Sequence, residues 1–393
     1  MDKFLIKKFS QKFAQKELDA IEFDDNYKNL AIDKFQSQAY KIFNLTPIQA
    51  TILKQTALSC GTDCAVHKDV LTQKIEYCDA ILFGTTKQIK QIIKKLLSQP
   101  FKLKILAQNL EYIIQNQFSE FQIRQKVFKP NNTYLMGILN ITPNSFSDGG
   151  EFIEENKAIE HFSIMIEQGA DIIDIGAEST RPGAAEIDEN TQLDKLLPIL
   201  NYINKHNIKI PISIDTRNSN VAEICIKNGA NIINDVSGFD FDNKMAEIIS
   251  QNPNTKVIIQ HSKGTPETMQ DNPNYENTID EIYFSLNKKI ETAINFGIKK
   301  ENIITDPGIG FGKTREDNFK IIKHWKEFKT LGCPVMIGLS RKSLLGIPES
   351  SNEEKDMYSL ALSTPLIYEN IDYLRVHNVK IYKKFMDILP NSY

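Results

Sequence analysis

Short apolar runs of strand length recur along the last two-thirds of the chain. They lie at 134–140, 171–176, 210–215, 231–235, 256–261, 302–306, 334–340 and 373–377. Segments of helical periodicity separate them, and those at 156–169, 219–229 and 278–297 each end on glycine, the usual residue just past a helix C-terminus. Strand alternating with helix predicts a parallel sheet.

Eight such units fit a (β/α)₈ TIM barrel, which takes roughly 250 residues. An open, doubly wound sheet is the alternative. It would show fewer strands and a glycine-rich nucleotide turn after the first strand, whereas the sequence there reads GILNITPNS, which is not G-x-G-x-x-G. We therefore predict an α/β protein whose residues 130–393 form a TIM barrel.

The first third of the chain predicts a smaller α/β domain, residues 1–124, ahead of a polar, proline-containing stretch at 125–134. Within it, 46–61 reads as a helix with Thr46 as N-cap, Pro47 in the first turn and Gly61 past the end. Residues 79–100 read as a strand, a threonine cap and an amphipathic helix. We expect an accessory domain, and its sequence does not indicate a role.

Composition narrows the class of protein. A length of 393 residues indicates two domains, and a net charge of −3 with pI near 6.1 argues against a nucleic-acid binder. No stretch approaches 18 uninterrupted apolar residues and the first 16 residues have no signal-like apolar core, so we expect no membrane association and a cytoplasmic protein. Five cysteines fit reduced thiols. The spacing of Cys60, Cys64, His67 and Cys78 matches no common zinc pattern, although the cluster leaves metal binding open.

Nearly every predicted strand ends in polar or charged residues. They are Asn140, 178–181, Asp215, Asn234 with Asp235, Gln260 with His261, Asp306, 340–342, and Arg375 with His377. In a closed barrel all these ends face one rim, where active sites of this architecture lie. A single Asn, Asp or Ser after a strand often only caps the next helix. Capping does not require Arg181, Lys342, Arg375 and His377, so we predict a site at this rim.

The rim residues suggest two subsites. Arg181, Arg375 and His377 suit a phosphate or diphosphate, and Asn140 with the 142–150 loop suits a loosely held Mg²⁺. The second set, Asp215, Asn234 and Asp306, needs hydrogen-bond donors, which a heterocycle with adjacent N–H and NH₂ groups offers. No G-x-S-x-G motif and no cysteine beside a base is present, so we predict electrostatically assisted displacement of diphosphate without covalent catalysis.

Eight sequence blocks resemble dihydropteroate synthases, the sulfonamide-sensitive enzymes of folate biosynthesis. They are GILNITPNSFSDGG (137–150), DIIDIGAESTRPGA (171–184), PISIDT (211–216), IINDVSG (232–238), GTPETMQ (264–270), DPGIGFGK (306–313), GLSRKS (338–343) and RVHNV (375–379). The resemblance implies a transferase that condenses 6-hydroxymethyl-7,8-dihydropterin diphosphate with p-aminobenzoate, using Mg²⁺, as a homodimer.

The resemblance also implies roles for individual residues. Asn140 would bind Mg²⁺, and the diphosphate and the edge of the pterin site would lie among Thr180, Arg181, Arg375 and His377. The pterin ring would contact Asp215, Asn234, Asp306 and Lys342, with Asp174 below. The p-aminobenzoate pocket would include Phe146, Pro182, Phe311 and Ser340. Asp215 and Asp306 would stabilise a cation-like methylene, while Arg375 and His377 would stabilise the leaving group.

Four positions depart from the family pattern: Gln260, which would place an amide against the pterin face, Ser262, Asn144 and Arg217. Their effects on affinity and sulfonamide sensitivity stay open. Two alternatives remain. A pterin-binding methyltransferase domain would keep Asp215, Asn234 and Asp306 but has no use for the STRPG, GLSRK and RVH segments. A barrel that binds pterin without catalysis is opposed by the cationic rim.

Overall fold

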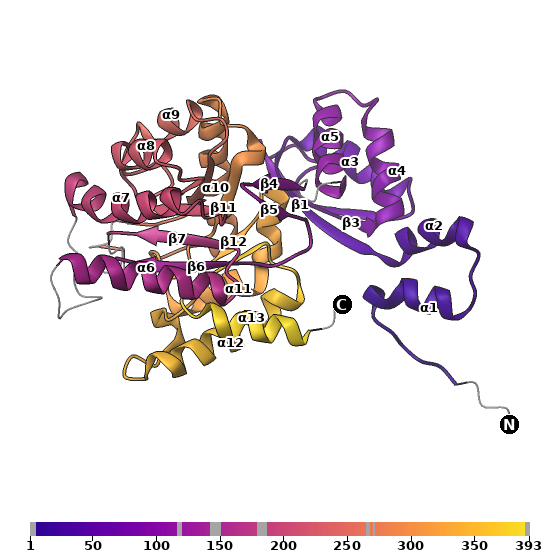
Figure 1. Ribbon diagram of the computed structural model, residues 1–393. Helices are drawn as coiled ribbons and strands as arrows, with labels where there is room; N and C mark the ends of the chain where they lie inside the picture. Colours follow the sequence, from indigo (N-terminus) through magenta and orange to yellow (C-terminus); the bar gives the residue numbers. More distant parts are fainter. Residues whose placement is uncertain are drawn as a thin grey trace. The chain divides into compact units, whose positions relative to one another are not determined.

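The computed structural model describes residues 5–115, 120–141, 151–178, 187–264, 268, 269 and 272–389. The chain forms two compact units, Met1–Asn116 and Gln117–Tyr393 (Figure 1). The division falls earlier than the predicted limit at 124, because a short hairpin, β4 (Phe121–Ile123) and β5 (Lys126–Phe128), packs into the core of the second unit.

The first unit is a small three-stranded antiparallel sheet with helices. Its strands, in the order β1-β3-β2, are β1 (Ser37–Leu45), β2 (Asp63–Val66) and β3 (Cys78–Thr85). Its helices are α1 (Ala14–Ala20), α2 (Asp25–Phe35), α3 (Pro47–Leu58), α4 (Thr86–Leu96) and α5 (Leu103–Gln115). Thr46 and Thr85 each form a capping box with a glutamine three residues on, which confirms the predicted starts of α3 and α4.

The second unit is a closed parallel barrel. Its strands are β6 (Tyr134–Asn140), β7 (Ile172–Gly176), β8 (Ile212–Asp215), β9 (Ile232–Asp235), β10 (Lys256–Gln260), β11 (Ile303–Asp306), β12 (Met336–Ile337) and β13 (Tyr373–Val376). Neighbouring strands pair in parallel from β11 through β6 to β12, and a bridge between Thr305 and Val335 joins the two ends. The predicted TIM barrel is confirmed. β12 is shorter than the predicted run at 334–340.

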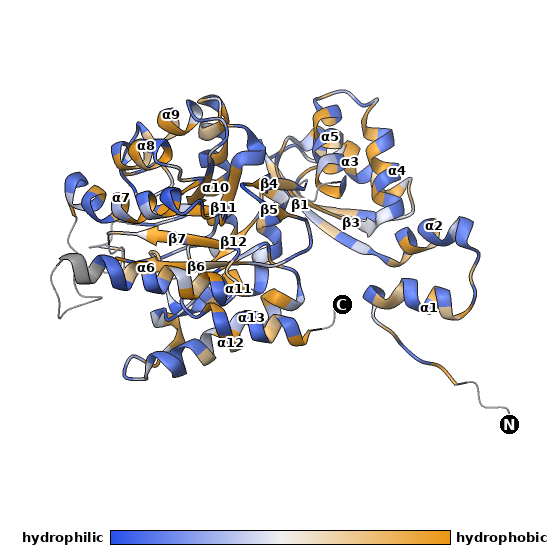
Figure 2. Cartoon of the chain, viewed as in Figure 1, coloured by the Kyte–Doolittle hydropathy of each residue, from blue (hydrophilic) through white to orange (hydrophobic). Residues whose placement is uncertain are grey.

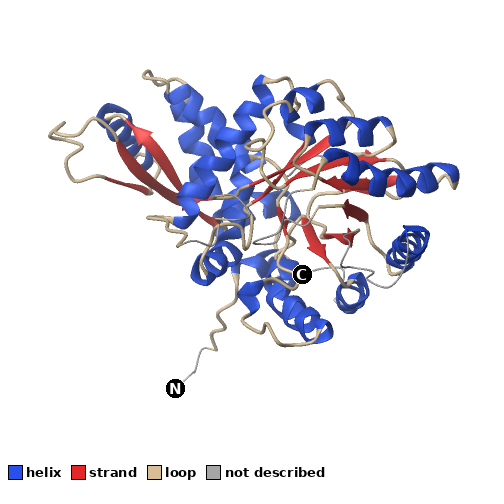
Figure 3. Ribbon diagram, turned by 90° about the vertical axis from the view of Figure 1, so that its left-hand side faces the viewer, coloured by secondary structure: helices blue, strands red, loops and turns tan. Residues whose placement is uncertain are grey.

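Helices surround this barrel on the outside, as the strands and helices of Figure 3 show. They are α6 (Glu151–Glu167), α7 (Glu189–Lys205), α8 (Ser219–Lys227), α9 (Met245–Ser250), α10 (Thr278–Asn295), α11 (Arg315–Phe328), α12 (Asn352–Tyr368) and α13 (Val379–Ile388). The glycines that end α6, α8 and α10 have positive φ, which confirms the predicted stops. Within the described ranges, no helix combines the length and apolarity needed to cross a membrane.

Alternation along the strands divides their apolar residues between two cores. One set, including Leu135, Ile173 and Ile214, packs against the surrounding helices. The other set fills the barrel interior with Tyr134, Met136, Ile172, Ile232, Ile258, Ile304, Met336 and Tyr373. In Figure 2 the strands are accordingly hydrophobic along most of their length. Phe128 of the hairpin is fully buried, with its ring centroid 4.7 Å from that of Tyr134, so the hairpin closes the N-terminal end of the barrel.

Candidate active site

The two-residue period of a strand places the polar residues of the barrel mouth. Asp174 follows the interior residue Ile172 by two positions, so both side chains lie on the same face of β7. On their own strands, Asn234, Asp306 and Arg375 likewise follow an interior residue by two positions. Register brings them level, because Asp215 pairs with Gly176 on one side and with Asn234 on the other. Polar groups from several strands therefore converge above an apolar floor.

Arg375 lies at the centre of this group. Its Nε donates to Asp174 Oδ2 at 2.6 Å, and its Nη2 donates to Asp215 Oδ2 at 2.6 Å. Asn234 Nδ2 donates to the same Asp174 oxygen at 3.1 Å. The sequence suggested Arg375 as a cation without nearby acids. In the structure it is paired with two buried carboxylates, because the barrel brings β13 across from β7 and β8.

Three oxygens of this network have no hydrogen-bond partner among the described residues: Oδ1 of Asp174, Oδ1 of Asp215 and Oδ1 of Asn234. All three residues are at most 5% exposed. A buried acceptor without a partner costs free energy, on the order of 1–3 kcal/mol. Such a cluster suits a ligand that presents several N–H donors at once.

Burial and charge shift the pKa of the groups here in opposite directions. Burial raises the pKa of Asp215 to about 7, although the Arg375 charge opposes this. Burial likewise raises the pKa of Asp306, and Lys342 opposes it. The pKa of Lys342 is lowered by burial to about 8, with Asp306 acting against the shift. Burial lowers the pKa of Arg375, but Asp174 and Asp215 outweigh it and the net pKa is raised.

The loop after β11 folds tightly over the end of β10. Asp306 Oδ1 accepts from the Gly308 amide at 2.7 Å. Gly308 has φ 72°, and a Cβ on it would lie 1.9 Å from the His261 carbonyl oxygen, so only glycine fits. Lys342 Nζ donates to the Ile309 carbonyl at 2.6 Å and lies 4.8 Å from the Phe311 ring centroid. The turn therefore brings an acid, an amine and an aromatic ring together.

His261 and Lys313 support this turn from behind. Lys313 Nζ lies 2.9 Å from His261 Nδ1 and donates to the Phe311 carbonyl at 2.9 Å. Burial, then the charge of Lys313, lowers the pKa of His261 to about 2, so this histidine is neutral at physiological pH. His261 therefore holds the turn instead of contributing charge.

The remaining described rim residues lie on neighbouring strands. Ser340 Oγ is 3.0 Å from His377 Nδ1 and accepts from the His377 amide at 3.2 Å. Asn140 ends β6 beside Gly176, where an added Cβ would lie 3.5 Å from Asn140 Oδ1 and 3.3 Å from Asp215 Cβ. The amide oxygen of Asn140 is thus close to the carboxylate network.

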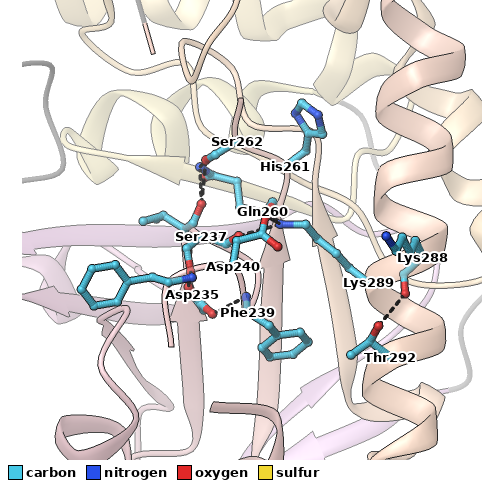
Figure 4. Close-up of polar contacts among 12 residues, drawn as sticks. Asp235, Ser237, Phe239, Asp240, Gln260, His261, Ser262, Lys288, Lys289 and Thr292 are labelled. Atoms are coloured by element: carbon cyan, nitrogen blue, oxygen red, sulfur yellow. Dashed lines mark hydrogen bonds and ion pairs between the residues drawn. The ribbon is translucent and has the colours of Figure 1, made fainter. Parts of the chain in front are cut away.

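Two departures from the family pattern have structural partners (Figure 4). Gln260 Nε2 donates to the Val236 carbonyl at 3.2 Å, and Ser262 Oγ donates to the same carbonyl at 2.8 Å. The Gln260 amide, which was expected to lie against the pterin face, thus donates a hydrogen bond to the protein backbone. Lys289 from α10, which sequence reasoning missed, joins this region by an ion pair with Asp240 at 2.7 Å. A lone lysine on a helix gave no signal.

Arg217 has a local structural partner too. It forms a buried ion pair with Glu178 and lies 4.2 Å from the Phe241 ring centroid. The pair joins the loops after β7 and β8. The predicted residues Thr180, Arg181, Pro182 and Phe146, and the departure at Asn144, lie outside the described residues.

No group of three or more metal-binding side chains occurs within the described ranges. Asn140 offers an amide oxygen at the mouth, which fits an ion that takes its other ligands from substrate phosphates and water. The five cysteines are free thiols.

Fold and site together define a pterin-binding TIM-barrel enzyme, and residues 136–377 match the family described as pterin binding enzyme. A dihydropteroate synthase of Clostridium beijerinckii is 41% identical over 249 residues, which cover 63% of this chain and 89% of that protein. The chain belongs to the dihydropteroate synthase family.

Two further comparisons extend this result. The crystal structure of a dihydropteroate synthase from Anaplasma phagocytophilum with bound 6-hydroxymethylpterin-monophosphate has a TM-score of 0.60 at 42% identity, covering 65% of this chain and 98% of that one. A bifunctional dihydropteroate synthase/dihydropteroate reductase of Helicobacter pylori is 35% identical over 338 residues, 85% of this chain and 84% of that protein. That match is longer than the barrel unit, so it extends into the first unit.

Proposed function

We propose that the chain condenses 6-hydroxymethyl-7,8-dihydropterin diphosphate with p-aminobenzoate to give dihydropteroate and diphosphate. One observation carries the proposal: at the mouth of a TIM barrel, Asp174 and Asp215 bind the Arg375 guanidinium, and the Oδ1 atoms of Asp174, Asp215 and Asn234 have no partner among the described residues. A pterin presents adjacent ring N–H and NH₂ donors, which match these acceptors. The crystal structure of the Anaplasma relative with bound 6-hydroxymethylpterin-monophosphate supports the same ligand class.

The pterin ring binds to the acidic side of the mouth. Asn234 and Asp215 accept from the ring N–H and NH₂ groups, and Asp306 accepts on the opposite edge. Lys342 donates to a ring acceptor, with its amine held by the Ile309 carbonyl. Phe311, next to Lys342, forms one wall of the p-aminobenzoate site, with Ser340 as a donor.

The diphosphate binds to the cationic side. Arg375 turns its guanidinium from the carboxylates toward the phosphates when substrate enters, and His377 and Arg181 add further donors. Asn140 would hold Mg²⁺ through its amide oxygen, and the bound ion would supply positive charge that offsets the charge of the diphosphate. By the family resemblance, Thr180 contributes to diphosphate binding, and Phe146 and Pro182 contribute to the p-aminobenzoate site.

The chemical step is a substitution at the methylene carbon. The bond from this carbon to the diphosphate oxygen breaks and the electron pair leaves with diphosphate. The arylamine nitrogen then forms the new C–N bond and releases a proton to water. Asp215 and Asp306, as buried carboxylates, stabilise the positive charge on the pterin methylene. Arg375 and His377 stabilise the charge of the departing diphosphate.

The test is diphosphate release from the pterin diphosphate with Mg²⁺, in the presence and absence of p-aminobenzoate. Amine-dependent release is expected. Release that ignores the amine, or no release, would reject the proposal and favour a methyltransferase-like or purely binding barrel. Arg375→Ala and Asp306→Ala should each lower kcat/KM by at least about 100-fold, since each removes a charge-stabilising group.

We also propose a homodimer and a cytoplasmic location. The family resemblance supports the dimer, and five free thiols accord with a reducing compartment. Gel filtration with light scattering distinguishes a mass near twice 44.9 kDa from the monomer.

A second candidate activity is reduction of dihydropteroate. It is favoured by the match to the bifunctional Helicobacter protein, which extends beyond the barrel into the first unit. The test supplies the full chain with dihydropteroate and a reduced nicotinamide and follows nicotinamide absorbance. Absence of dihydropteroate-dependent oxidation would reject this second activity.

A further inference from the structure

A single carboxylate behind the barrel mouth links the loops that follow β12 and β13. Asp356 lies on α12, and its side chain is 3% exposed. Its Oδ1 accepts from Arg341 Nε at 2.6 Å, and its Oδ2 accepts from Arg341 Nη2 at 2.7 Å and from Asn378 Nδ2 at 3.1 Å. The two parallel bonds from the arginine form a bidentate pair, which fixes orientation as well as distance.

Arg341 is held in a conformation that arginine rarely adopts. Its φ is 57°, in the left-handed region that disfavours residues with a Cβ. Its amide donates to Ser359 Oγ at 3.0 Å, one turn along α12 from Asp356. Both the backbone and the side chain of Arg341 are therefore anchored to the same helix. A strained residue persists in a fold only when its surroundings hold it in this way.

The residues on either side of this anchor belong to the active site. Arg341 lies between Ser340 and Lys342, and Asn378 directly follows His377. Ser340 and His377 already contact each other through the 3.0 Å pair of Oγ and Nδ1. A shift of either loop would change that contact and would move Lys342 relative to Asp306.

We infer that Asp356 is a positioning residue for the synthase reaction. Through Arg341 and Asn378 it holds Ser340, Lys342 and His377 at fixed separations, although it contacts none of the proposed substrate sites itself. A displacement of about 1 Å at such groups can cost on the order of 100-fold in rate. The inference rests on the proposed function, because it concerns how that site is held.

The first test is Asp356→Asn, which keeps the shape but replaces one acceptor by a donor that faces the guanidinium. We expect kcat/KM for p-aminobenzoate to fall at least ten-fold, through both a lower kcat and a higher KM. Asp356→Glu, which retains the two acceptors and the charge, should recover a substantial part of this loss. A residue that only stabilises the fold would produce neither the combined change in kcat and KM nor its recovery in Asp356→Glu.

The second test separates the anchor from backbone strain. Arg341→Gly removes the side chain but adopts φ 57° without strain, so the loop keeps its backbone bond to Ser359 while losing the side-chain pair with Asp356. We expect the same fall in kcat/KM as in Asp356→Asn. The double variant should be no worse than either single variant, because both break one pair.

Asp372→Asn is the matched control. Asp372 is also buried and accepts two hydrogen bonds, from the Val335 amide at 2.9 Å and from Lys329 at 3.0 Å, but it lies just before β13, away from the mouth. We expect a lower Tm with kcat/KM within about two-fold of the parent chain. Parent-like kcat/KM in Asp356→Asn and Arg341→Gly would overturn the inference. An inactive parent chain would instead overturn the proposed function.

Discussion

Replacing Arg375 with alanine removes the guanidinium that joins two buried carboxylates, the side chains of Asp174 (0% exposed) and Asp215 (6% exposed). Removing one partner of a buried ion pair costs about 3–5 kcal/mol, because the remaining charge is left without compensation. Asp215 can avoid part of this cost by taking up a proton, since burial has already raised its pKa to about 7. We therefore expect the loss in the free energy of unfolding to depend on pH.

The sign follows from the proton balance. A carboxyl whose folded pKa is above its ordinary value of 3.8 binds a proton more tightly in the folded state, so its contribution to stability declines as pH rises between 3.8 and about 7. Without the Arg375 charge the pKa of Asp215 rises further, and the decline continues above pH 7. Each additional unit is worth about 1.4 kcal/mol. The deficit of Arg375→Ala should thus be larger at about pH 8.5 than at about pH 5.5.

Urea unfolding followed by fluorescence of the single tryptophan, Trp325, measures this deficit, because Trp325 is buried in α11 of the barrel unit. Arg124→Ala is the control. Its guanidinium donates to Asn231 Oδ1 and to the Ile208 and Gly229 carbonyls, none of which titrates. Its deficit should be equal at the two pH values. Equal deficits for Arg375→Ala would refute the reasoning.

Three further predictions concern other parts of the barrel unit. The kcat/KM for the pterin substrate should fall below about pH 7 as Asp215 takes up a proton and above about pH 8 as Lys342 loses one, and a pH-rate profile that is flat from about 5 to 9 would contradict this. Gly308→Ala should lower the free energy of unfolding by about 1–3 kcal/mol and raise KM for the pterin, because the new Cβ meets the His261 carbonyl; an unchanged KM would argue against that turn as the support of the site. Phe128→Ala should lower the free energy of unfolding by about 3–5 kcal/mol. It should leave kcat/KM within about two-fold of the parent, since the hairpin lies at the end of the barrel opposite the site. A large loss in kcat/KM would contradict that placement.

The sequence predicted the strands and helices because a buried parallel strand is a continuous apolar run, whereas the helix that follows it has a 3.6-residue apolar period. All eight predicted barrel strands occur, although the seventh is reduced to Met336–Ile337. Its predicted run, 334–340, continues into the loop that carries Ser340. Apolar character extends past the strand here because Leu339 is buried beside the mouth without pairing in the ladder.

The candidate site was predictable as a set of residues but not as a network. Polar residues after apolar runs indicated one rim, since all parallel strands of a barrel end on the same side. The sequence did not indicate which of these side chains form ion pairs with one another. Arg375 pairs with Asp174, 201 positions earlier, and with Asp215, 160 positions earlier. Asp356 gave no signal at all, because an aspartate in an amphipathic helix usually faces solvent.

Local periodicity along the chain predicted the barrel strands and helices and the polar side chains that follow the strands. Which of those charges meet depends on how the barrel closes. Closing the barrel sets β13 beside β6 and places Arg375 against acids from β7 and β8, in a medium that excludes water. Coulomb interactions depend on distance and on burial, and neither quantity is a property of any single stretch of chain.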